Sequence, residues 1–148
     1  MARTIYTIGF TQKTARRFFE ALKAAGVRRL LDVRLNNTSQ LAAFAKRDDL
    51  EYFLDAIAGI AYAHVPRFAP TQEILDAFKK SKGAWDEYET AFRALLKERN
   101  AIEEFNPALL DGPSCLLCSE PTPEQCHRRI VAEALKERWP DLEIVHLP

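Results

Sequence analysis

The chain has 148 residues, of which 47% are hydrophobic and 28% are charged, and its formal net charge is zero. This length suits one domain with a sizeable core, and the balanced charge does not indicate a protein that binds nucleic acid with its whole surface. No apolar run approaches the roughly 20 residues that a membrane helix needs, and the first residues show no signal-peptide pattern. We therefore expect a cytoplasmic protein without a membrane partner.

The charges are distributed unevenly along the chain. Residues 1–70 hold eleven Lys and Arg against six Asp and Glu, whereas residues 71–148 hold ten against fifteen. Two explanations are open: two oppositely charged halves that pack together, or a local basic face on the first half that binds nucleic acid. The oligomeric state does not follow from either.

The first forty residues predict two strands separated by a helix. A β-branched and aromatic run at 3–8 is typical of a strand. Thr11 or Thr14 is expected to cap the following helix, and Gly26 to end it. Residues 29–33 predict the second strand, which an Asn-rich loop follows.

The middle of the chain is mainly helical. A helix is expected over 50–58, with Asp48 or Asp49 as its cap and Gly59 at its end, followed by a third strand at 60–65. From residue 71 to about residue 110 the spacing of apolar residues is helical. This stretch forms a helical insert between two strands.

The last forty residues predict a strand at 115–119, a helix that ends near residue 138, and a strand at 142–147. Thr122, Pro123 and Gln125 match the N-cap, N1 and N3 positions of a capping box. The alternation of strands and helices along the chain indicates a single α/β domain with a mostly parallel five-stranded sheet flanked by helices.

Polar residues follow the carboxyl ends of these strands. In a parallel sheet these ends meet at one edge, where ligands bind. We expect an anionic, phosphate- or nucleotide-like ligand there, contacted by Thr11, Asp32, Arg34, His64, Arg67 and Arg128. Asp32 and Arg34 point to the same side of their strand, so they form either an internal ion pair or an anion site that Asp32 orients.

The segment from Cys118 to Arg128 is the most informative part of the chain. Cys118, Glu120, Cys126 and His127 surround one strand-to-helix turn and are the candidate catalytic residues. A helix N-terminus lowers the pKa of a nearby thiol, and a carboxylate or an imidazole there can move protons. Cys115 lies on the opposite face of the strand from Cys118 and is expected to be a core residue.

The cysteines do not indicate a disulfide framework, because their number is low and odd, and we expect all three to be thiols in a reducing cytosol. Adjacent helical residues diverge by about 100°, so Cys126 and His127 should not face one centre. We therefore assign no metal ligands. A metal centre of Cys118, Cys126 and a histidine such as His64 is the second alternative.

Common cofactor motifs are missing from the sequence. It has no Gly-x-Gly-x-x-Gly dinucleotide fingerprint and no Walker A motif, and it also lacks the Gly-x-Ser-x-Gly elbow. The sequence therefore predicts no particular cofactor.

With these residues the chain resembles the domain-of-unknown-function 488 family nearly from end to end. The resemblance rests on Thr7-Ile-Gly9, Leu31-Asp-Val-Arg34, Gly59 to His64, Trp85-x-x-Tyr88, and Leu116-Leu-Cys118-x-Glu120 with Cys126-His127-Arg128. The chain departs from the family pattern at Phe10-Thr11 and after Arg34. The resemblance implies a compact α/β fold and no assigned reaction.

The function that we expect from these residues is enzymatic. A thiol at the carboxyl edge of the sheet would act on the bound anion as a nucleophile. The first alternative is a non-catalytic module that binds a nucleotide or a nucleic acid.

Overall fold

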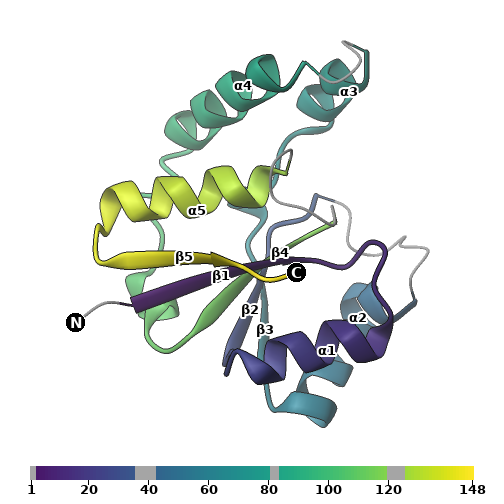
Figure 1. Cartoon of the computed structure of the whole chain (residues 1–148). Helices are drawn as coiled ribbons and strands as arrows, with labels where there is room; N and C mark the ends of the chain where they lie inside the picture. Colours follow the sequence, from purple (N-terminus) through teal and green to yellow (C-terminus); the bar gives the residue numbers. More distant parts are fainter. Residues whose placement is uncertain (1–2, 36–42, 81–83, 120–125) are drawn as a thin grey trace.

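The computed structural model describes residues 3–35, 43–80, 84–119 and 126–148. At its centre lies a five-stranded sheet with the order β3-β2-β4-β1-β5, and every pairing in it is parallel (Figure 1). This confirms the α/β class. The strands are β1 (Arg3–Gly9), β2 (Arg29–Asp32), β3 (Ala61–His64), β4 (Ser114–Cys118) and β5 (Leu142–His146).

Helices cover both faces of the sheet and bury a separate core on each (Figure 1). On one face, α1 (Ala15–Ala24) and α2 (Arg47–Phe53) pack against the sheet. On the other face lie α3 (Gln72–Lys80), α4 (Trp85–Glu98) and α5 (His127–Arg138). None of the described helices is both long and apolar enough to cross a membrane.

The ends of α1 follow the local signals in the sequence. Thr14 is the N-cap, and its side chain accepts a hydrogen bond from the backbone N–H of Arg17 at 3.1 Å. Such a bond satisfies one of the free N–H groups of the first turn. Gly26 follows the helix with φ +71°, a conformation that glycine adopts without strain. The structure thus selects Thr14 over Thr11 as the cap.

The start of α2 differs from the sequence prediction. Its N-cap is Lys46, and Asp48 and Asp49 lie in the first turn, where carboxylates still interact favourably with the helix dipole. The helix continues as a π-helical turn over Leu54–Ala58, and Gly59 ends it in the left-handed conformation. The predicted end is therefore confirmed and the predicted cap is wrong.

The start of α5 also differs, with a consequence for the site. The helix begins at His127, and Cys126 is its N-cap in an extended conformation, with φ −135° and ψ 137°. The expected capping box of Thr122 to Gln125 lies outside the described residues.

Ion pairs fix α5 against α4. Glu89 of α4 accepts from Arg93 at 2.9 Å and from Arg129 of α5 at 2.8 Å, and these hydrogen bonds lower the pKa of Glu89. Arg129 and Arg93 also pair with Glu133 of α5. A network of this kind holds geometry better than isolated surface pairs do, so the first turn of α5 has a defined position over the sheet.

Candidate functional site

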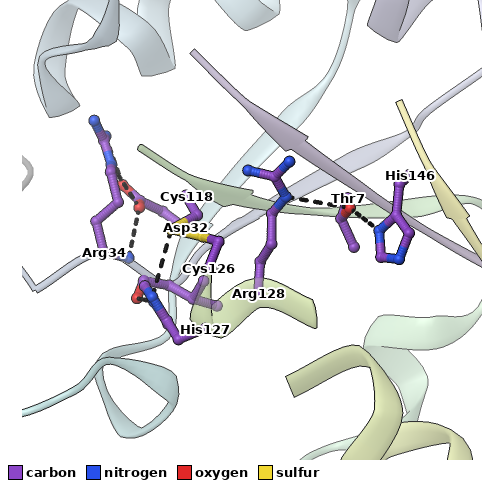
Figure 2. The surroundings of a disulfide bond; sticks show 9 residues. Thr7, Asp32, Arg34, Cys118, Cys126, His127, Arg128 and His146 are labelled. Atoms are coloured by element: carbon purple, nitrogen blue, oxygen red, sulfur yellow. Dashed lines mark hydrogen bonds and ion pairs between the residues drawn. A yellow bond between two sulfur atoms is a disulfide. The ribbon is translucent and has the colours of Figure 1, made fainter. Parts of the chain in front are cut away.

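The two cysteines of the predicted site lie together. Cys118 ends β4, Cys126 precedes α5, and a disulfide joins them (Figure 2). This corrects the expectation of three thiols: the fold returns the chain to the end of β4 after only eight residues, which a count of cysteines does not reveal. Both side chains are almost completely buried.

Cys115 is the free cysteine of the described chain, and it is buried. It packs in the core on the α1 and α2 face, as the alternation along a strand predicts. Burial raises the pKa of its thiol. Cys115 is therefore a core residue, and the reactivity of its buried thiol is a reference for that of the other two cysteines.

His127 lies between the sulfurs and the end of β2. Its Nδ1 is 3.4 Å from Sγ of Cys118, and its Nε2 is 2.6 Å from the carbonyl oxygen of Val33. Because a carbonyl only accepts, Nε2 carries the hydrogen and Nδ1 presents a lone pair to the sulfur. The ring of Phe92 from α4 packs edge-on against the imidazole at 5.4 Å. The orientation of His127 is thus fixed from two sides.

The expectation that Cys126 and His127 diverge is wrong. The 100° rule holds for two residues within a helix, whereas Cys126 is an extended N-cap. Ligand atoms of Cys118, Cys126 and His127 consequently all lie within 4.8 Å of one another. His64, the histidine considered for a metal centre, is not a member of this group.

The protonation state of His127 follows from its burial. Burial lowers its pKa to about 4, and the positive charge of Arg128 acts in the same direction. The hydrogen bond to Val33 and the charge of Asp32 act against this shift. At neutral pH the imidazole of the disulfide form is therefore uncharged.

Asp32 and Arg34 form an internal ion pair. Nε and Nη2 of Arg34 donate to the two carboxylate oxygens at 2.9 and 2.8 Å, and Nη1 donates to the carbonyl of Ala45 at 2.7 Å. Burial opposes ionisation of Asp32, but the hydrogen bonds and charge of Arg34 and the hydroxyl of Tyr62 together lower its pKa. Of the two alternatives for this pair, the geometry matches the structural one.

This ion pair and the disulfide lie on opposite faces of the sheet. Arg34 stacks over Phe10 of the core on the α1 and α2 face, at 5.3 Å. Cys118 lies two residues after Leu116, a residue of the core under α4 and α5. The ion pair and the disulfide thus lie at the same edge of the sheet but on different faces of it.

Arg128 belongs to the group on the α5 face. Its side chain is completely buried, and Nε donates to the hydroxyl of Thr7 at 3.3 Å (Figure 2). The same hydroxyl is hydrogen-bonded to Nδ1 of His146. The pKa of Lys13 is lowered first by partial burial and then by the charges of Arg128 and Arg17. Positive charge therefore gathers where the loop after β1 meets the start of α5.

Of the remaining predicted residues, Thr11 and His64 contact backbone next to the site, whereas Arg67 contacts another part of the chain. The N–H of Thr11 donates to the carbonyl of Ser119, directly after Cys118, at 3.1 Å. His64 donates from Nε2 to the carbonyl of Arg34 at 3.2 Å. Arg67 instead pairs with Glu104 and the carbonyl of Arg99, in the segment after α4. Glu120 lies outside the described residues.

Four contributions to the site were not predicted: Thr7, Lys13, Tyr62 and the carbonyl of Val33. Tyr62 was detectable, because it precedes His64 by two residues and so shares its face of the strand. Thr7 is one of three hydroxyl-bearing residues of β1, with Thr4 and Tyr6, and its residue type alone does not single it out. The Val33 carbonyl is a backbone group, and no residue type marks it.

One comparison with known proteins gives a match. The model of the family described as "Domain of unknown function DUF488" matches residues 14–135, which include Cys118, Cys126 and His127. No curated protein and no solved structure matches the chain.

Proposed function

The chain belongs to the DUF488 family, whose description names no reaction, and from the site itself we propose an enzyme that uses the Cys118 thiol on an anionic small molecule. One observation carries this proposal: Sγ of Cys118 is 3.4 Å from Nδ1 of His127, the ring nitrogen that carries the lone pair. A nucleophile within reach of a base that a third group orients is the usual arrangement of covalent catalysis. Here the carbonyl of Val33 orients the base.

The reactive form in this proposal is the reduced protein. The thiol of Cys118 passes its proton to Nδ1 of His127, and a thiolate and an imidazolium result. The negative thiolate stabilises the charged ring, which the neutral disulfide cannot do. The thiolate then attacks the electrophilic atom of the substrate, and the departing group takes the proton back from Nδ1. A reducing cytoplasm would keep the site in this form.

Cys126 has a part in the same scheme. When the adduct on Cys118 contains a reducible bond from sulfur to a leaving group, the thiolate of Cys126 attacks the sulfur of Cys118. The disulfide forms, and the leaving group departs with both electrons of the broken bond. The two cysteines are eight residues apart in the sequence and their sulfurs are within bonding distance, which supports this role.

The charge around the site supports an anionic ligand. Arg128 and Lys13 bring positive charge to the edge where β1 and β4 end. The N-terminus of α5, with its partial positive charge, faces the same edge and favours phosphate or carboxylate. Arg34 is committed to Asp32, so we assign anion binding to Lys13, with the buried charge of Arg128 adding to the positive potential there.

Alkylation of the reduced protein tests the role of the thiol. With chelator present, the rate of iodoacetamide modification at each cysteine is followed by mass spectrometry between pH 5 and 10. We expect Cys118 to react with an apparent pKa below the ordinary value of about 8.5, and the His127→Gln variant to react about 100-fold more slowly at pH 7. Cys115 should stay unmodified until the protein unfolds.

The matched control is His64→Gln, which removes an imidazole from the same edge without touching Cys118. Equal inertness of Cys118 and Cys115 in the folded protein would contradict the proposal. If ligand binding instead survives in Cys118→Ser and Cys126→Ser but not in Lys13→Ala, the non-catalytic binding module is the better description.

A further inference from the structure

We propose that the reduced protein binds one zinc-class divalent cation through Sγ of Cys118, Sγ of Cys126 and Nδ1 of His127. This inference does not depend on the proposed reaction, since it needs only the three side chains. All three ligand atoms lie within 4.8 Å of one another, and those of Cys118 and His127 are 3.4 Å apart. Ligand atoms of a tetrahedral zinc ion are separated by about 3.4–3.8 Å, given its bond lengths of about 2.0–2.3 Å.

The second hydrogen bond of His127 is typical of a metal ligand. A metal-bound histidine usually donates its other N–H to a carbonyl or a carboxylate, which fixes the ring and its tautomer. Here Nε2 donates to the carbonyl of Val33 at 2.6 Å, and Nδ1 points at the sulfurs. The edge-on ring of Phe92 supports the imidazole from the side of α4. The ring is therefore oriented for a ligand before any ion arrives.

The backbone positions of the cysteines suit an ion between the sulfurs. Their Cα atoms are 7.2 Å apart, which is slightly beyond the range of about 4.4–6.8 Å that most disulfides span. One cysteine ends a strand in the middle of the sheet and the other caps a helix. Both ligands thus come from regular elements.

The donor set selects the class of metal. Two thiolates and an imidazole suit zinc, or cobalt as its spectroscopic substitute, and disfavour magnesium and calcium, which prefer oxygen ligands. Three ligands leave the fourth position of a tetrahedral ion to water or a substrate atom.

Metal and disulfide exclude each other. Binding of the cation replaces the two thiol protons, which are released to solvent, and the charge of the two thiolates balances that of the ion. The disulfide offers no thiolate, so the oxidised protein has lost two of the three ligands. The wild-type protein can therefore serve as its own control.

Metal content tests this inference directly. Wild-type protein reduced with a phosphine is incubated with Zn²⁺, desalted and analysed for metal by mass spectrometry. We expect one ion per chain, and none in the oxidised wild type. Cys118→Ser, Cys126→Ser and His127→Gln should each lose the ion, whereas Cys115→Ser should retain it. With Co²⁺, thiolate charge-transfer absorption should appear in the same samples.

Two results would overturn the inference: folded, reduced wild type that retains no ion, or an ion retained equally in the oxidised form. Both are measured on wild-type protein, so a variant that fails to fold does not decide the test. Failure of this proposal and failure of the enzyme proposal remain distinct. If Cys118 is not alkylated in the presence of chelator but the reduced protein binds one zinc ion, only the enzyme proposal is contradicted.

Discussion

Replacing Asp32 with alanine is expected to lower the free energy of unfolding by about 3–5 kcal/mol. The guanidinium of Arg34 is 2% exposed and would keep its charge without the two carboxylate oxygens that it now contacts at 2.8 and 2.9 Å. Removal of one partner from a buried ion pair has a cost of this size, because the other charge stays buried. Urea unfolding of the purified variant measures the loss.

Two further variants sharpen this experiment. The double variant Asp32→Leu with Arg34→Met removes both charges and should recover most of the lost stability. Arg16→Ala removes an exposed partner of Glu20 and should have little effect. If Asp32→Ala alone behaves like Arg16→Ala, the pair does not stabilise the fold in the way we describe.

The oxidised protein is expected to lose about 2 kcal/mol of stability between pH 7 and pH 4.5 through His127 alone. Its pKa is about 4 in the folded protein and about 6.5 in an unfolded chain. The unfolded chain therefore takes up a proton first as the pH falls, and unfolding becomes more favourable between these two values. Above pH 6.5 this contribution to stability is fully present, and below pH 4 it is lost.

Denaturant unfolding of the oxidised protein in chelator, at both pH values, isolates this effect. His127→Gln should lack the 2 kcal/mol component, whatever its stability at pH 7, because glutamine does not titrate. His64→Gln should keep it. An identical loss in wild type and His127→Gln would show that His127 is not buried in its neutral form.

Parts of the fold that local signals determine were predictable from the sequence. The cap at Thr14 and the ends at Gly26 and Gly59 depend on the chemistry of one or two residues, and the structure has all three. The start of α5 was not predictable, because Cys126 is held in an extended conformation by a bond to Cys118 on another element. Tertiary contacts of this kind leave no local pattern.

The edge of the sheet that carries the candidate site was predictable from the sequence, but the arrangement of side chains at that edge was not. That the strand ends of a parallel sheet meet follows from topology alone. The sequence did not reveal which side chains share a face of that edge, because this depends on how β2 pairs between β3 and β4. For the same reason Asp32 and Arg34 were placed with the cysteines, although they lie across the sheet from them.

The peptide link between Val33 and Arg34 joins the two faces of this edge. The carbonyl of Val33 accepts from His127 on one side, and the N–H of Arg34 in the same peptide donates to the carboxylate of Asp32 at 3.1 Å. The Arg34 side chain anchors the same backbone through Asp32 and Ala45 on the other side. A substitution in the core beneath α1 and α2 that tilts this peptide plane would therefore move the carbonyl that accepts from His127. The imidazole beside Cys118 would move with it. In such a variant, the chemistry of the sulfurs would change without any substitution on their own side of the sheet.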